Sequence, residues 1–409
     1  MVPNGWKLST IEEISSVSSG GTPSRKNSSY WNGNIPWVTT AEVQFKIIED
    51  TAEKITEEGL ANSSAKLFPV DTILMAMYGQ GKTRGQVAKL GIEASTNQAC
   101  AAIILKSEYY VDYYYQFLIS QYKNIREMSN SGGQENLSGG IVKSIQVPVP
   151  PLSEQKKIAQ ILSTWDKAIT TTEQLLANSQ QQKKALMQQL LTGKKRLLDK
   201  NGVRFSGKWK FQTISQISKR IQRKSDGEDH PILTISSLSG FVRQDERYSR
   251  YMAGESVKKY ILLKQGEFAY NKGNSKTYEF GCIFDLDCYD TGLVPHVYVC
   301  FKLNQGLSHR YFKYLFEADY LKPQLGALVN TGVRNNGLLN IKPSEFMNTK
   351  VPVPCFDEQE QIADVLHASS ETINKLQKKL DALKQEKKAL MQQLLMGKRR
   401  VKIDDKEVA

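Results

Sequence analysis

The chain has 409 residues, of which 40% are hydrophobic and 24% are charged, and its formal net charge is +13. This composition excludes a disordered chain, and the length exceeds that of one ordinary domain, so two or three domains are expected. The excess of Lys and Arg favours a polyanionic partner over an ordinary soluble surface, because binding phosphates releases the counterions condensed on nucleic acid.

The N-terminal residues carry no recognisable targeting signal. Residues 1–8 lack the apolar core of a secretion signal, and no apolar run approaches the roughly 20 residues of a membrane helix. We therefore expect a cytoplasmic protein. The five cysteines form no Cys-x-x-Cys pair and the four histidines lack metal-ligand spacing, so we expect free thiols and no metal site.

The first segment, residues 1–146, mixes short β-branched or aromatic runs with Gly, Asn and Ser turns, which is typical of an α+β domain. Residues 99–105 have the length of a strand, and residues 111–122 are the most helix-like. Its loops contain Gly, which lets a backbone approach DNA, with Lys, Arg, Gln and Asn, which bind phosphates or base edges. The candidate DNA-binding residues here are Tyr78, Gln80, Lys82, Arg84, Gln134 and Asn136.

Two alternatives apply to the loop of residues 78–84. It can be an ordinary solvated loop, or, within the stretch 76–83 (AMYGQGKT), a loose phosphate-binding loop. A nucleotide site needs a helix that begins near Lys82, but Gly85 and Gly91 interrupt the stretch in which that helix would lie. A nucleotide-using enzyme therefore stays an alternative, and ATP binding tests it.

The second segment, residues 147–198, predicts one long helix. Its VPVP lead-in is extended, Ser153 is placed to cap the helix, and Gly193 is placed to end it. Apolar residues recur with a period of 3.5 between these points, as in coiled coils. Such a helix has about 40 residues and spans roughly 60 Å.

The third segment, residues 199–350, repeats the order of the first with different residues. Trp6 and Trp209 open the two segments, and a second helix-like stretch occupies residues 308–320. The loop of residues 272–278 (KGNSKTY) takes the place of the loop of residues 78–84. The candidate DNA-binding residues here are Lys272, Asn274, Lys276, Arg334 and Asn335.

The fourth segment, residues 351–401, repeats the second, and a tail of residues 402–409 comes after it. KKALMQQLL occurs at residues 183–191 and again at residues 387–395, and VPVP occurs at 147–150 and 351–354. Asp357 and Gly397 occupy the same capping positions as in the first copy. This repeat is too long and too regular to arise by chance.

The repeat predicts two α+β domains (1–146 and 199–350) and two long helical segments (147–198 and 351–401) that are nearly constant between the two copies. We expect the helices to form an antiparallel intramolecular coiled coil with pseudo-two-fold symmetry. A four-helix assembly with another chain is the alternative. Lys183 and Lys387 fall in the apolar seam, and we expect their ammonium groups to reach water.

The helices carry more apolar and Gln-rich surface than one seam uses, which predicts a protein partner on each side. The candidate partner-binding residues are Glu154, Gln155, Ile161, Met187, Glu358, Gln359, Val365 and Met391. We find no nucleophile elbow or other catalytic constellation in the sequence.

The alternation of variable domains and conserved helices resembles the specificity (S) subunit of Type I restriction–modification enzymes. The motifs that carry the resemblance are VPVPPLSEQKKIAQIL with KKALMQQLLTGKKR, and VPVPCFDEQEQIADVL with KKALMQQLLMGKRR. It covers essentially the whole chain, and it is specific in the helices and weak in the variable domains.

The resemblance implies that each variable domain recognises one half of a split, asymmetric site in double-stranded DNA, and that the helices set the spacing. Two methyltransferase subunits would bring S-adenosylmethionine, and restriction subunits would use ATP and Mg²⁺. The chain itself would bind no cofactor and perform no chemistry. A stand-alone DNA-binding regulator with a coiled-coil spacer is the alternative.

Overall fold

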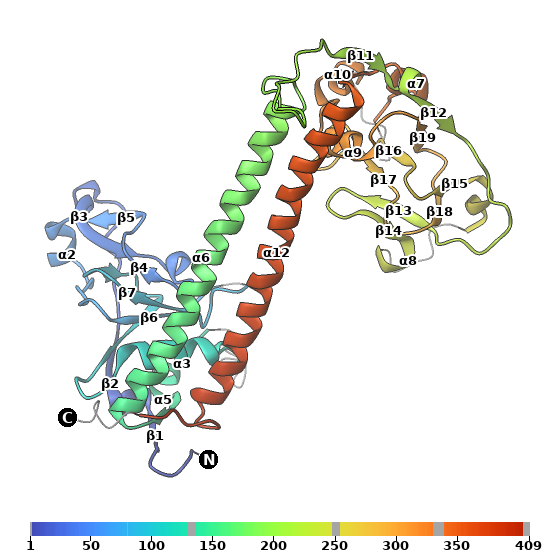
Figure 1. Ribbon diagram of the computed structural model, residues 1–409. Helices are drawn as coiled ribbons and strands as arrows, with labels where there is room; N and C mark the ends of the chain where they lie inside the picture. Colours follow the sequence, from blue (N-terminus) through green and yellow to red (C-terminus); the bar gives the residue numbers. More distant parts are fainter. Residues whose placement is uncertain (1, 80, 129–135, 248–253, 330–338, 404–409) are drawn as a thin grey trace. The chain divides into compact units, whose positions relative to one another are not determined.

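The chain divides into two structural units, one of which combines distant parts of the sequence. In this computed structural model, unit 1 contains residues 1–173 and 378–409, and unit 2 contains residues 174–377. The structure describes residues 2–79, 81–128, 136–247, 254–329 and 339–403 (Figure 1). Each unit mixes helices with sheets, and each contains parts of two long helices.

Unit 1 is built on a five-stranded sheet in the order β2-β9-β6-β7-β4. β6 is buried along its whole length because both faces of the sheet are covered, which explains its unbroken run of apolar residues. β2 and β6 both pair antiparallel with β9, so these two strands are parallel and end at the same edge. The strands are β2 (Ser15–Ser19), β4 (Ile47–Ile48), β6 (Ile73–Ala76), β7 (Val87–Leu90) and β9 (Cys100–Leu105).

Smaller elements surround this sheet. A three-stranded sheet has the order β5-β3-β8, and a two-stranded sheet joins β1 to β10. The strands are β1 (Lys7–Thr10), β3 (Trp31–Val38), β5 (Glu53–Ile55), β8 (Ser95–Thr96) and β10 (Gln146–Val149). The helices are α1 (Ile11–Ile14), η1 (Ser28–Tyr30), η2 (Thr40–Glu42), α2 (Glu57–Ala61), α3 (Val111–Ser120), α4 (Tyr122–Met128) and α5 (Gly139–Ser144).

Unit 2 repeats this plan with a four-stranded sheet in the order β12-β19-β16-β17, and pairs β13-β14, β15-β18 and β11-β20. The strands are β11 (Lys210–Thr213), β12 (Ser218–Ile221), β13 (Leu233–Ser236), β14 (Gly240–Arg243), β15 (Ile261–Lys264), β16 (Phe268–Asn271), β17 (Cys282–Asp285), β18 (Thr291–Val294), β19 (Val299–Leu303) and β20 (Lys350–Val353). The helices are α7 (Ile214–Ile217), α8 (Gln244–Arg247), η3 (Gly254–Lys259), α9 (His309–Glu317), α10 (Lys322–Leu328) and α11 (Pro343–Met347).

The long helices are α6 (Leu152–Leu190) and α12 (Phe356–Leu394), each of 39 residues. Both begin one residue before the predicted caps, so the prediction that Ser153 and Asp357 cap them is wrong. In the first turn of each helix a glutamine, Gln155 or Gln359, donates its side-chain amide to a proline carbonyl of the VPVP lead-in, 2.8 Å away, and this contact ties the lead-in to the helix.

The glycines at the helix ends adopt the predicted left-handed conformation. Gly193 has φ +71° and Gly397 has φ +68°, which only glycine adopts without strain. A Cβ atom on Gly193 would lie 3.4 Å from the Trp209 ring, whereas one on Gly397 would lie 2.5 Å from Cγ of Pro3. The second glycine therefore has a packing role as well as a conformational role.

These two glycines give a first prediction. Gly193→Ala should lower the free energy of unfolding by about 1 kcal/mol, the conformational cost alone. Gly397→Ala should cost about 2–4 kcal/mol, because the new methyl group also overlaps the Pro3 ring. Urea unfolding of both variants measures the difference, and equal losses would contradict the packing role.

A Trp–Glu–Arg cluster ties the start of α12 to the rest of unit 2. The carboxylate of Glu358 accepts hydrogen bonds from Arg196 at 2.5 and 2.7 Å and from the indole of Trp209 at 2.9 Å. Glu358 is 1% exposed. A buried carboxylate with three charge-assisted or indole donors is well compensated for its lost hydration.

Unit 1 contains the same cluster, made by the other copy of each residue. Glu154 accepts hydrogen bonds from Trp6 at 3.3 Å and from Nε of Arg400 at 2.8 Å, and it is 5% exposed. The end of one repeat therefore binds the start of the other repeat within each unit.

The seam lysines also find partners inside each unit. Lys387 lies 2.5 Å from Asp166 in unit 1, and Lys183 lies 2.5 Å from Glu317 in unit 2. Their side chains are 12% and 13% exposed, and the bond between Lys183 and Glu317 lies at the surface of unit 2. Each stem is therefore largely covered while its ammonium group is held in an ion pair.

None of the helices within the described ranges combines the length and the apolar character that crossing a membrane requires.

Candidate DNA-binding surface

The candidate loop of unit 1 is a turn between β6 and β7. Gly79, Gly81 and Gly85 have φ values of +136°, +70° and +82°, so the backbone doubles back sharply here. The described residues after Lys82 form turns and then β7, not a helix. The loop therefore lacks the helix N-terminus that a phosphate-binding loop needs.

Helix α4 braces this loop from the side. The Tyr122 hydroxyl donates to the carbonyl oxygen of Lys82, and Arg126 donates to the Tyr122 hydroxyl at 3.0 Å and to the carbonyl of Arg84 at 3.3 Å. Both braces act on backbone atoms, so they position the loop and leave the Lys82 side chain exposed. Sequence reasoning missed these two residues, because their distance of about 40 positions from the loop gives no local pattern.

The structure brings most of the described candidates of unit 1 together. Tyr78 and Lys82 are exposed and Arg84 is half-buried in the β6–β7 loop. Asn136 is exposed, and the next residue, Leu137, donates its backbone N–H to the carbonyl of Met77 at 3.0 Å. Asn136 thus lies beside the start of the loop. The remaining candidates, Gln80 and Gln134, lie outside the described residues.

The corresponding loop of unit 2 comes after β16. Asn274 and Lys276 are exposed, while Lys272 is half-buried and donates to the carbonyl of Ile341 at 3.2 Å. Leu339 donates its backbone N–H to the carbonyl of Lys272 at 3.0 Å, which matches the Leu137 contact in unit 1. Lys272 is therefore partly a structural residue. Arg334 and Asn335 lie outside the described residues.

The candidate partner residues are largely buried within their own units. Glu154 and Glu358 belong to the Trp–Glu–Arg clusters. The Gln155 side chain accepts from the Tyr110 N–H at 2.9 Å, and Gln359 accepts from the Ser308 N–H at 2.9 Å. This placement corrects the expectation that the Glu-Gln pairs offer a docking surface, because their polar atoms are already used.

The apolar partner candidates are placed in a similar way. Met187 is 8% and Met391 is 7% exposed, and each packs in the core of its unit. Ile161 and Val365 are half-buried beside the same cores. Only the half-buried pair keeps surface that a partner could contact without displacing a core side chain.

One set of possible metal ligands occurs among the described residues. Ligand atoms of Asp226, Glu228 and His230 lie within 4.8 Å of one another. Both ring nitrogens of His230 already have protein partners, Asp226 Oδ1 at 2.7 Å and Thr291 Oγ1 at 2.9 Å. The His230 ring therefore already has two hydrogen-bond partners, while Asp226 and Glu228 are exposed.

Comparison with known proteins finds relatives in the family that the sequence motifs resemble. Residues 3–178 match the family described as the Type I restriction modification DNA specificity domain. The specificity subunit of the Type I restriction enzyme MjaVIII from Methanocaldococcus jannaschii is 24% identical over 98% of this chain and 94% of its own length. The resemblance to Type I specificity subunits is confirmed.

Other Type I specificity subunits match a smaller region. The MjaIX specificity subunit of M. jannaschii is 33% identical over 175 residues, and the EcoR124I/EcoR124II specificity subunit of Escherichia coli is 31% identical over 167 residues. These matches span only 39% and 40% of the two relatives.

Solved structures share the fold. The S subunit of a Type I system from M. genitalium superposes with a TM-score of 0.58 at 14% identity, covering 97% of this chain and 98% of that chain. A chain from a study of complex assembly in the Type I restriction–modification system has a TM-score of 0.57 at 13% identity. These likenesses show that the chain shares its fold with these structures.

Proposed function

We propose that this chain is the DNA sequence-recognition subunit of a Type I-like restriction–modification complex, and that it performs no catalysis itself. One observation carries the proposal: both units hold a Gly- and Lys-containing loop at the end of an equivalent strand, β6 or β16, with different residues in each. Equivalent placement with different side chains is what the recognition of two different half-sites requires.

In this proposal the chain retains the division into recognition domains 1–146 and 199–350, spacer helices 147–198 and 351–401, and a tail. The helices form an antiparallel coiled coil that sets the gap between the half-sites. Ion pairs between opposite helices support this: in unit 1, Asp166 pairs with Lys387 and Glu173 pairs with Lys384 at 2.7 Å. As the residue number rises along α6 it falls along α12, as antiparallel helices require.

The proposed partners are double-stranded DNA, two methyltransferase subunits and restriction subunits. The methyltransferase subunits would hold S-adenosylmethionine, and the restriction subunits would hold ATP and Mg²⁺. Ile161 and Val365 occupy matched positions in the two repeats, so each can contact one methyltransferase copy. Co-expression followed by mass measurement tests this, and a chain that stays free in the presence of its methyltransferase would contradict it.

Paired loop variants test the recognition role. Lys82→Ala with Arg84→Ala should weaken recognition of one half-site, and Asn274→Ala with Lys276→Ala should weaken recognition of the other. Each base contact that is lost should cost about 1–3 kcal/mol and relax one position of the site. Binding of the assembled complex to duplexes with one altered half-site measures this, and variants that change neither half-site would remove these loops.

A stand-alone DNA-binding regulator is the second candidate, favoured only by the basic charge of +13. It predicts tight, sequence-selective binding by the purified chain without a methyltransferase. The complex proposal predicts that selectivity rises sharply when the methyltransferase is added. Titration of the same duplex with and without the partner separates the two.

A further inference from the structure

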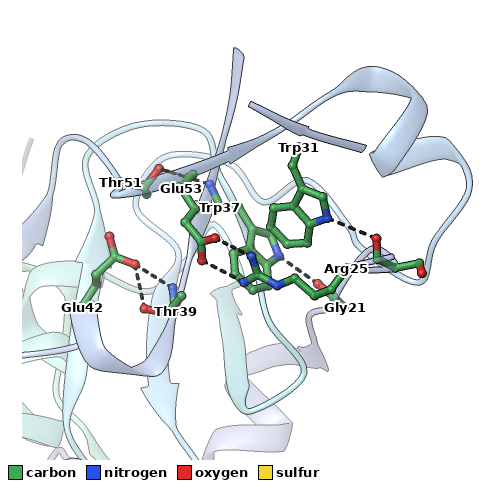
Figure 2. A network of polar contacts seen from close by, with 9 residues as sticks. Gly21, Arg25, Trp31, Trp37, Thr39, Glu42, Thr51 and Glu53 are labelled. Carbon is green, nitrogen blue, oxygen red and sulfur yellow. Dashed lines mark hydrogen bonds and ion pairs between the residues drawn. The ribbon is translucent and has the colours of Figure 1, made fainter. Parts of the chain in front are cut away.

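The loop after β2 in unit 1, residues 20–30, is held in place by two indole rings. Trp37 donates its indole N–H to the carbonyl of Gly21 at 2.9 Å, and Trp31 donates to the carbonyl of Ser24 at 3.2 Å (Figure 2). The two rings pack edge to face, with centroids 5.1 Å apart. The loop backbone is therefore fixed at two points by buried or half-buried side chains.

Arg25, which belongs to the loop, also binds two side chains outside it, Trp31 and Glu53. Its guanidinium carbon lies 3.7 Å from the centroid of the Trp31 ring, and its two terminal nitrogens bind both carboxylate oxygens of Glu53 (Figure 2). The hydrogen bonds from Arg25 lower the pKa of the Glu53 carboxyl, so the pair stays ionised. The pair also neutralises Glu53, which would otherwise repel a phosphate.

This loop leaves the sheet beside the candidate DNA-binding loop. β2 and β6 flank β9 and run parallel, so their ends lie roughly 10 Å apart at one edge. The loops after both strands contact the residues just before β9: the Thr22 hydroxyl donates to the side chain of Gln98, and Met77 donates its N–H to the carbonyl of Ala99 at 2.8 Å. The two loops thus share one edge of unit 1.

We propose that residues 22–30 are a second DNA-contacting loop of unit 1, in which Lys26 binds a backbone phosphate and Arg25 is the positioning residue. The proposal rests on the proposed DNA-recognition function. Lys26 is exposed, lies directly after the anchored Arg25, and is flanked by the exposed Ser24 and Ser28. A rigid loop with an exposed ammonium and hydroxyl groups suits a phosphate contact, which fixes the register of the protein on DNA.

Unit 2 offers a matched control. An Arg-Lys pair also lies after β12, but Arg223 binds Glu267, at the start of β16, and the carbonyl of Leu262 at 3.1 Å. The Lys224 ammonium donates to the carbonyl of Lys259 at 3.0 Å. Both side chains of this pair are therefore bound within unit 2, so the proposal does not extend to this loop.

The test measures binding of the full chain to a 30-base-pair duplex of random sequence across a range of salt concentrations. The binding constant K falls as salt rises, and Lys26→Ala should make this negative slope of log K against log salt flatter by about 0.9. The variant's loss of affinity relative to the wild-type chain should therefore be roughly three- to fourfold larger at 50 mM than at 200 mM salt. Lys224→Ala should leave the slope unchanged. An unchanged slope in Lys26→Ala would overturn the proposal.

A double variant tests the positioning role of Arg25. Arg25→Gln should reproduce the slope of Lys26→Ala, and Arg25→Gln with Lys26→Ala should be no weaker than Lys26→Ala alone, because both remove the same contact. Additive losses would show that Arg25 does not act through Lys26.

The failure of this inference can be told apart from the failure of the proposed function. If Lys82→Ala lowers binding while Lys26→Ala does not, this inference fails and the proposed function stands. If the wild-type complex binds all duplexes alike, the proposed function fails.

Discussion

Replacing Glu358 by alanine is expected to lower the free energy of unfolding by about 3 kcal/mol, the effect of breaking a buried ion pair. The carboxylate is 1% exposed and holds both Arg196 and Trp209, so its loss leaves two donors without their acceptor. The side chain of Arg196 is 21% exposed and recovers some hydration, which keeps the cost at the lower end of the usual range. Urea unfolding followed by tryptophan fluorescence measures the change.

Glu360 provides the control for this variant. It lies two residues further along α12, its side chain is 37% exposed, and its distance to Arg310 is 3.9 Å. Glu360→Ala should therefore cost less than about 1 kcal/mol, as exposed ion pairs usually do. A Glu358→Ala protein as stable as Glu360→Ala would show that the cluster does not hold unit 2 together.

Removing one heptad from each long helix, residues 176–182 and 380–386, is expected to abolish methylation of the original DNA site by the assembled complex. The deletion keeps the seam in phase and shortens the proposed spacer by roughly 10 Å, or about three base pairs. Three base pairs are also roughly a third of a turn of the duplex, so the half-sites at the original gap no longer face both domains. Methylated-site mapping should recover the same half-sites at a shorter gap.

The deletion removes Lys384 and so its ion pair with Glu173, whose side chains are both about half exposed. It keeps Asp166 with Lys387 in unit 1 and Lys183 with Glu317 in unit 2. Each half-site alone should be bound as in the wild-type chain, which serves as the control for folding. Methylation of the original gap at the wild-type rate would mean that the helices do not set the spacing.

The long helices were predictable because their pattern is local and occurs twice. A period of 3.5, a proline-containing start and a glycine end each constrain the backbone within a few residues, and these constraints are enough to specify α6 and α12. The same local reasoning misplaced the start of α6 at Ser153. The backbone N–H groups of Glu154 and Gln155 both donate to the carbonyl of Pro151, so the first helical turn already includes Leu152.

The candidate DNA-binding loops were only partly predictable, because their supporting residues lie far away in the sequence. Glycines and lysines in the loop of residues 78–84 are visible in the sequence, but the bracing residues Tyr122 and Arg126 become neighbours only when the chain folds. The buried Glu-Gln pairs were misassigned because polar residues on a helix usually face solvent. The burial of their glutamates depends on Trp6 or Trp209, about 150 positions earlier.

Unit 1 combines residues from both ends of the chain, and this affects the order in which the two units can fold during synthesis. Its core contains Leu394 and Leu395, and the buried Tyr113 hydroxyl donates to the carbonyl of Leu395 at 3.2 Å. Residues 1–173 therefore leave the ribosome long before the segment that completes their core. Unit 2, whose residues are contiguous, can finish first, which reverses the usual order of domain maturation. Until α12 is made, residues 1–173 expose the apolar surface that Leu394 and Leu395 later cover, and exposed apolar surface of this kind favours aggregation.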